Sequence, residues 1–251
     1  MSDMFASAKS VLRRADYHIT DLQTTVQGFA PNKPYIYRAD RDSKTGKYLH
    51  KIVFSESFSD DISCIMFDAI NNLRAALDQM TFAVAGRFRG GDDFAQFPFA
   101  KDADHWPAKI KGLKDDIPPE IIAVFERFKP YKGGNDTLWA LNYIANIKKH
   151  AILIPAGFGG SMLSLPTRLT SDPSFEWTER DPFGDNHEIE FFLSDQPDLS
   201  TDIQFSFTVV IRHSEEIIEG KEPVSFLNTI RTEVALIFAS VEAVCKRLGW
   251  A

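Results

Sequence analysis

Two segments of this sequence carry polar side chains at helical spacing, where a plain core helix would need none. The first segment contains Asp68, Asn71, Arg74 and Asp78. At about 100° per residue, these side chains fall within about a third of a helix circumference. Arg74 and Asp78 are four residues apart and can form an ion pair. An arginine supplies a planar cation for a carboxylate or a phosphate, so this stripe has the chemistry to bind an anion.

The same stripe also fits a solvent-exposed helix face with a structural ion pair, which is the commoner origin of such a pattern. However, Phe67, Ala75 and Phe82 share this face and indicate that it is at least partly covered. Both interpretations stay open at the level of sequence.

A second polar stripe, at 4-3-4-3 spacing, runs through residues 135–150. Its members are Asn135, Trp139, Asn142, Asn146, Lys149 and His150. The rest of the segment is mostly apolar, as in a buried helix whose amide side chains need hydrogen-bond partners. One interpretation is a buried amide ladder that fixes packing. The other is a pocket in which His150 serves as an acid or base near neutral pH. A polar site forms between two helices if this stripe faces Asn71, Arg74 and Asp78.

Apolar residues at 3-4-3-4 spacing predict the long helices that must position these stripes. The predicted helices cover residues 5–29, 57–86, 135–150 and 223–248. A shorter helix is expected from Pro119 to about Phe128, since proline is favoured in the first turn. The long helices are expected to form a bundle.

Alternating apolar and polar residues predict strands in the remaining chain. The predicted strands are 34–39, 48–54, 151–156, 162–165, 187–193 and 202–212. The first two flank a turn at Asp42–Gly46, and the next two flank a glycine-rich turn at Gly157–Gly160. The sequence therefore predicts an α+β fold, in which the helices pack beside one antiparallel sheet of about six strands. No segment resembles an interdomain linker, so we expect residues 1–251 to form a single domain.

The composition of the chain limits the classes of molecule that such a site would bind. The formal net charge is −7, whereas a broad surface for nucleic acid needs the opposite sign. RNA is therefore not favoured, although a local basic pocket is compatible. The histidines show no HxH or HExxH spacing, so no metal or cofactor is expected.

Cys64 and Cys245 fall in apolar helical segments, and we expect both to be buried thiols in a reducing compartment. With no pattern of a signal peptide or membrane span, we expect a cytoplasmic protein without membrane contact.

The string at residues 68–79 resembles the GDxxHNLRSALDH string of a family of uncharacterised bacterial and phage-associated proteins. Residues 146–150 are similar to the NxDKHR string of the same family. The Pro-Tyr-Lys-Gly-Gly run at 130–134, followed by Leu-Trp-Ala-Leu at 138–141, is a further similar segment. The order of elements also fits, so the resemblance covers most of the chain. It implies no particular activity.

The Arg-x4-His core of that string also resembles the catalytic motif of HEPN-type ribonucleases, which are small helical bundles and often dimers. This resemblance implies that Arg74 contacts the scissile phosphate, while Asp78 and Asn71 orient it. His150 would act as the acid or base in RNA cleavage without a metal. Gln79 stands where the motif has its histidine, so an inactive remnant is equally compatible.

The leading expectation is a cytosolic protein that binds a small ligand or a protein partner in a polar pocket between helices. Whether it is an enzyme stays open. The catalytic candidates are Arg74, Asp78 and His150, and the ligand-binding candidates are Asn71, Trp139, Asn142, Asn146 and Lys149. One alternative is a HEPN-like ribonuclease or its remnant. The other is a structural protein that assembles, for example as a homodimer, through its helices at 5–29 or 227–248.

Overall fold

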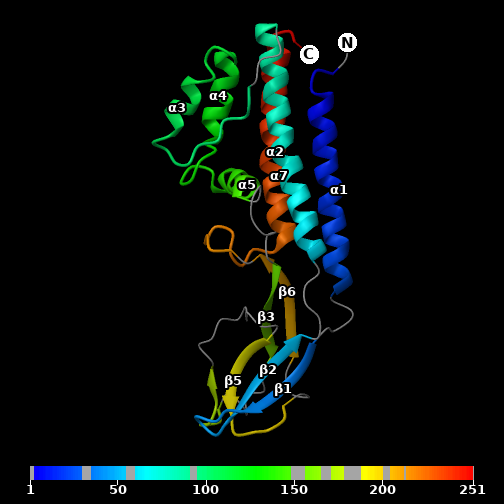
Figure 1. Ribbon diagram of the computed structural model, residues 1–251, viewed down its shortest axis with the longest axis vertical. Helices are drawn as coiled ribbons and strands as arrows, with labels where there is room; N and C mark the ends of the chain where they lie inside the picture. The colour runs from blue at the N-terminus through cyan, green and yellow to red at the C-terminus, as the bar shows by residue number, and fades with distance from the viewer. Residues whose placement is uncertain are drawn as a thin grey trace.

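The computed structural model describes residues 3–29, 35–54, 60–90, 95–147, 156–164, 171–177, 188–199, 204–211 and 213–250. Three long helices lie side by side along one half of an elongated molecule (Figure 1): α1 (Ala6–Phe29), α2 (Asp60–Arg89) and α7 (Pro223–Arg247). The strands lie at the other end of the molecule. Six helices and six strands are present in the described part of the chain.

The three long helices turn their predicted apolar stripes towards one another. Leu22 of α1, Leu73 of α2 and Val234 of α7 are fully buried in one core, as expected for amphipathic helices. The helix expected to end near Gly86 continues to Arg89. Gly90, at φ 75°, has the left-handed conformation that commonly ends a helix, whereas Gly86 lies inside α2.

Three shorter helices cover one side of this group: α3 (Trp106–Lys111), α4 (Pro119–Phe128) and α5 (Asp136–Ile147) (Figure 1). α5 packs against α2 and α7, and α4 packs against α7. Asn135 caps α5, because its Oδ1 accepts a hydrogen bond from the Leu138 N–H at 3.1 Å. α5 therefore stands where its polar side chains can reach α2.

The strands form two antiparallel sheets. The larger sheet has the order β1 (Tyr35–Arg41), β2 (Tyr48–Phe54), β5 (Glu188–Ser194), β4 (Glu176–Trp177). The smaller sheet pairs β3 (Ala156–Ser164) with β6 (Gln204–Ile211). The α+β class is confirmed, but the expectation of one sheet of about six strands is wrong. Alternation identifies a strand but not its partner, and the chain divides its strands between two sheets.

The predicted turn at Gly157–Gly160 is also wrong. These residues lie inside β3, where they pair with residues 207–210 of β6. By contrast, the predicted hairpin of β1 and β2 is confirmed. Its turn is closed by Asp42, whose Oδ2 accepts hydrogen bonds from Thr45, and by Gly46 at φ 76°.

The described residues form two hydrophobic cores. The larger core belongs to the helices and includes Val209 and Ile211 of β6. The smaller core lies on the four-stranded sheet, around Ile52, Ile189 and Phe192. The single domain over residues 1–251 stays a prediction.

One described helix, α7, is long and apolar enough to cross a membrane by length and composition. This is weak evidence, because a core helix passes the same test. The cytoplasmic location stays a prediction.

Of the two thiols, Cys245 is buried as expected, and burial raises its pKa to about 11. The expectation for Cys64 is wrong, because it lies on an exposed face of α2.

Candidate functional site

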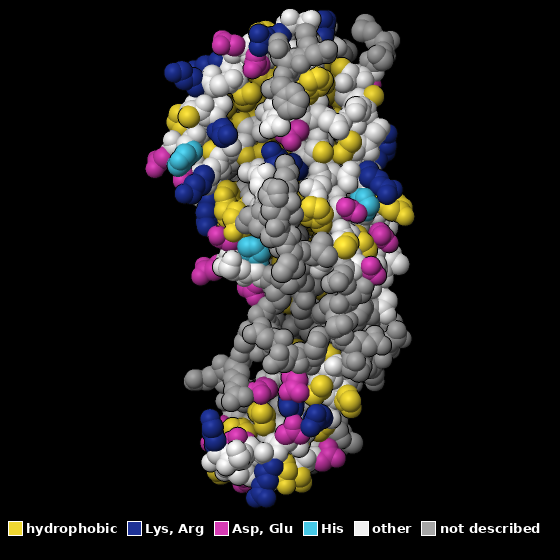
Figure 2. Space-filling view, in the orientation of Figure 1, with side chains coloured by type: hydrophobic (Ala, Val, Ile, Leu, Met, Phe, Trp, Pro, Cys, Tyr) yellow, Lys and Arg dark blue, Asp and Glu magenta, His cyan; other side chains and the backbone are white. Residues whose placement is uncertain are grey.

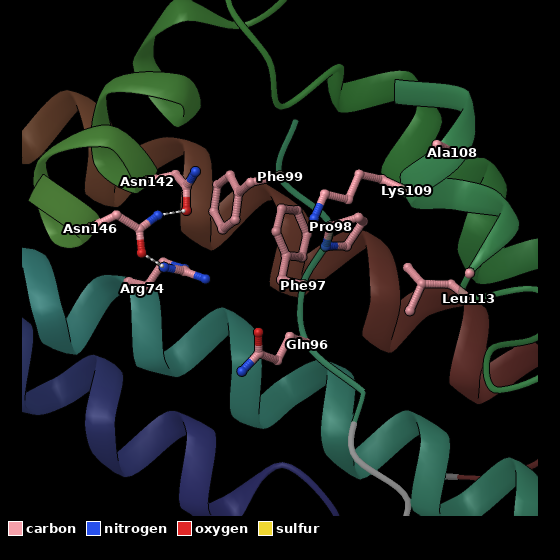
Figure 3. A pocket seen from close by; sticks show the side chains of 11 residues that line it. Arg74, Gln96, Phe97, Pro98, Phe99, Ala108, Lys109, Leu113, Asn142 and Asn146 are labelled. Atoms are coloured by element: carbon pink, nitrogen blue, oxygen red, sulfur yellow. Dashed lines mark hydrogen bonds between the residues drawn. The ribbon is translucent and has the colours of Figure 1, made fainter. Parts of the chain in front are cut away.

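The polar stripe of α2 meets the polar stripe of α5. Arg74 Nη1 donates a hydrogen bond to Asn146 Oδ1 at 3.3 Å, and Asn146 Nδ2 donates to Asn142 Oδ1 at 2.8 Å (Figure 3). Because these amides lie one helical turn apart on α5, they form a short ladder that ends on the guanidinium. The structure therefore brings together three of the candidate residues.

Asp78 lies one turn beyond Arg74 on α2 and holds two elements together. Its Oδ1 accepts a hydrogen bond from the Phe97 N–H at 3.1 Å. Its Oδ2 is 3.6 Å from Arg74 Nε, which is too long for a hydrogen bond but close enough for Coulomb attraction. Asp78 thus fixes the segment 95–100 beside the cation.

The guanidinium of Arg74 is largely buried but incompletely hydrogen-bonded. Its side chain is 17% exposed, and its carbon Cζ lies 5.0 Å from the centre of the Phe99 ring. The Nε atom is buried without a hydrogen-bond partner. A guanidinium has five N–H donors. Among the described residues, the Arg74 guanidinium donates one hydrogen bond, to Asn146. Burial of a cation is costly unless its donors are satisfied.

A pocket of about 470 Å³ opens beside this cation (Figure 3). Its volume is in the range of small-molecule sites. The described residues that line it are Arg74, Gln96, Phe97, Pro98, Phe99, Ala108, Lys109, Gly112, Leu113, Asn142 and Asn146. They come from α2, the segment 95–100, α3 with the two residues that follow it, and α5. They include two cations, Arg74 and Lys109, and no carboxylate.

The apolar wall of the pocket is held rigidly. Phe97 packs edge-to-face against Phe99 and against Phe125 of α4, with 4.9 Å between ring centres in both pairs. The Ala100 N–H donates to the Pro130 carbonyl at 3.1 Å, which fastens the end of the segment. Phe97 and Phe99 are both buried. The wall therefore presents a fixed apolar surface to the pocket.

Two other candidates lie elsewhere among the described residues. Trp139 does not line this pocket; it stacks on Tyr143 with 4.7 Å between ring centres, and Lys132 Nζ lies 4.6 Å from the centre of its ring. Trp139 shares a stripe with Asn142 but lies nearly a turn before it, beyond the pocket. Asn71 is half-buried on α2 and does not line the pocket either.

The candidates Lys149 and His150 lie outside the described residues, and so does any contact between His150 and Arg74. Gln79, at the position of the HEPN-motif histidine, is described. Its Oε1 accepts a hydrogen bond from Ser7 Oγ of α1 at 2.7 Å. This side chain is therefore directed to α1, whereas Arg74 is directed to α5. The ribonuclease alternative stays a prediction.

Sequence reasoning missed Gln96 and Lys109, which come from the pocket's other walls. Lys109 lies on α3, in a stretch that reads as polar and irregular. One sequence feature indicates the start of α3: Pro107 lies in the first turn of the helix, after Trp106. Gln96 had no signal, since an extended segment without strand pairing has no periodicity.

Comparisons with protein-family models, with curated proteins and with solved structures find no match to this chain. The resemblances drawn from the strings at 68–79 and 146–150 stay predictions. Among the described residues, no group of three histidine, cysteine or acidic side chains is placed to hold a metal ion.

Proposed function

We propose that this protein binds a small anionic molecule in the pocket between α2, α3 and α5. The observation that carries the proposal is Arg74, a largely buried cation that borders a cavity and whose hydrogen-bonding capacity is mostly unused within the described part of the chain. A carboxylate or phosphate in the pocket would accept hydrogen bonds from the guanidinium and offset its charge. A bound anion thus supplies acceptors for the guanidinium donors that have no hydrogen-bond partner among the described residues.

The remaining polar lining suits such a ligand. The side-chain amides of Gln96, Asn142 and Asn146 can each donate or accept a hydrogen bond. Lys109 is exposed and adds a second positive charge to the lining of the pocket. Because opposite charges attract more strongly where water is partly excluded, even two cations are enough to select an anion.

On the face of the molecule drawn in Figure 2, the described residues outside the pocket form no broad basic patch that would attract anions. Figure 2 shows basic and acidic side chains interspersed there over the described residues, rather than one broad basic patch. Together with the net charge of −7, this arrangement supports a local pocket for a small anion over an extended polyanion surface.

Thermal unfolding with added anions tests the proposal. A ligand that binds only the folded chain stabilises it by mass action, by about 2.7 kcal/mol at a hundred times its Kd. We expect phosphate or benzoate to raise Tm in the wild type and not in Arg74→Met. The matched control is Arg87→Met, which removes an exposed cation from the same helix outside the pocket. An equal rise of Tm in Arg74→Met and in the wild type contradicts the proposal.

A further inference from the structure

The lining of the pocket is divided into a polar end and an apolar end. Arg74, Asn142 and Asn146 form the polar end, where α2 meets α5 (Figure 3). The apolar end is formed by the apolar residues of the other two walls, the segment 95–100 and the region of α3, which also contribute the polar side chains of Gln96 and Lys109. Its residues are Phe97, Pro98, Ala108, Gly112 and Leu113.

We infer that the ligand of this pocket is an amphipathic anion, in which a carboxylate or phosphate group is attached to an aromatic or branched aliphatic body. This inference rests on the proposed anion-binding function and deepens it. The charged group would lie at Arg74, and the body would lie between Pro98 and Leu113. A small inorganic anion would leave the apolar end filled with water, whereas an apolar body removes that surface from water.

Lys109 is compatible with this division of the pocket. It projects from α3 towards the segment 97–99 (Figure 3). A lysine can lay its methylene chain along an apolar surface and still keep its ammonium in water. Because Lys109 is solvent-exposed and Arg74 is largely buried, the main contact with the anion is assigned to Arg74.

Gly112 offers a way to fill the apolar end without disturbing the polar end. It follows α3 at φ −69°, a conformation that any residue adopts. A Cβ placed on Gly112 would meet only the carbonyl oxygens of Lys109 and Ala108, at 3.6 and 3.8 Å, which are ordinary contacts. Because Gly112 lines the pocket, Gly112→Leu adds a bulky side chain to the pocket lining with little backbone strain.

The test measures Kd by calorimetry on the full chain for two matched pairs of probes: benzoate with acetate, and phenyl phosphate with inorganic phosphate. In the wild type, each aryl probe should bind about tenfold more tightly than its small partner, the gain expected from burial of roughly 60 Å² of apolar surface. Gly112→Leu should bring that ratio close to one and leave the Kd of the small anions unchanged. Gly28→Leu, at an exposed α1 position with open space around it, should keep the tenfold ratio.

Two results overturn the inference and leave the proposed function standing. One is equal Kd values for the aryl and small probes in the wild type. The other is a tenfold ratio that Gly112→Leu does not change. A third result overturns both: none of the four probes binds the wild type, or all bind Arg74→Met as tightly as the wild type. The pattern of binding across the two variants thus separates the two claims.

Discussion

The helical part and the four-stranded sheet each bury a polar side chain, but the two side chains differ in how completely they are hydrogen-bonded. In the sheet, His50 of β2 is fully buried and uses both ring nitrogens. In the helices, Arg74 of α2 is largely buried and leaves most of its donors unused among the described residues. The difference separates a polar group that holds the fold together from one that is available to a ligand.

The hydrogen bonds around His50 are consistent with a single neutral tautomer. The Leu199 N–H donates to Tyr37 Oη at 3.1 Å, so the Tyr37 hydroxyl can donate to His50 Nδ1 at 2.5 Å. His50 Nε2–H then donates to Ser194 Oγ at 2.8 Å. The ring also stacks on Phe192, with 4.6 Å between ring centres. This network connects β1, β2 and β5, and both ring nitrogens of His50 have hydrogen-bond partners within it.

Removal of the His50 ring should produce the largest effect. In His50→Leu, the Tyr37 hydroxyl loses its acceptor and Ser194 Oγ loses a donor, and each unmade hydrogen bond of a buried group costs about 1–3 kcal/mol. We expect the four-stranded sheet to lose about 2–4 kcal/mol of stability, measured by hydrogen exchange of β2 and β5 amides. The control His105→Leu, at an exposed position, should change stability by about 0.5 kcal/mol or less. Unchanged exchange in His50→Leu would show that the network is not structural.

Acidification should weaken the same sheet. Burial lowers the pKa of His50 below its ordinary 6.5, and the nearby Asp198 partly opposes this shift. The unfolded chain therefore binds the proton more readily, so stability is fully present above pH 6.5 and is lost as the pH falls below it. The slope should not exceed about 1.4 kcal/mol per pH unit. His50→Leu should lack this slope.

A carboxylate gives a control for the pH experiment within the same sheet. The hydrogen bond from Lys51 lowers the pKa of Asp40 below 3.8. Its contribution is present above pH 3.8 and is lost as the pH falls through the lowered pKa. A loss of sheet stability that begins only below pH 4 would assign the acid sensitivity to Asp40 rather than to His50.

A well-paired arginine gives the comparison for Arg74. Arg231 of α7 donates from Nε and Nη2 to both carboxylate oxygens of Asp16 on α1, at 2.8 and 3.1 Å. Both side chains are more than a third exposed, so we expect Arg231→Met to cost only about 0.5–1 kcal/mol in urea unfolding. A stability equal to that of the wild type would mean that this pair contributes nothing.

Arg74→Met should have the smallest effect on stability. Among the described residues, the guanidinium makes one hydrogen bond, at 3.3 Å, and lies 3.6 Å from Asp78, which keeps its hydrogen bond from the Phe97 N–H when the cation is removed. Because both contacts are long and the carboxylate stays hydrogen-bonded, we expect the free energy of unfolding without ligand to fall by no more than about 0.5 kcal/mol. A loss comparable to that of His50→Leu would show that Arg74, like His50, is part of the architecture.

Helix periodicity alone placed Arg74 on one polar helix face and Asn142 and Asn146 on another, but whether the two faces meet was left open by the sequence. Periodicity shows which residues share a helix face, and a polar face on a mostly apolar helix must find partners. The same reasoning could not show which residues of the stripe line the pocket. Trp139 lies on the predicted stripe but packs against Lys132 and Tyr143. Position along the helix axis depends on how the helices cross.

Long-range placement accounts for the other misses. Lys109 enters the pocket through the packing of a six-residue helix, and Gln96 enters through a segment fixed by Asp78 and Pro130. The sheet was mispredicted for the same reason, since β2 pairs with β5 about 140 residues away and not with β3. The Tyr37, His50 and Ser194 network depends on that pairing, so its members carried no signal in sequence.

The most direct test of the anion pocket is a crystal structure of the protein grown with phenyl phosphate. The proposal predicts phosphate oxygens at about 3 Å from the terminal nitrogens of Arg74, with the ring between Pro98 and Leu113. The contradicting result is a pocket without the probe, in which the chain's own groups accept hydrogen bonds from the remaining Arg74 donors. In that case Arg74 would be a satisfied structural residue like His50.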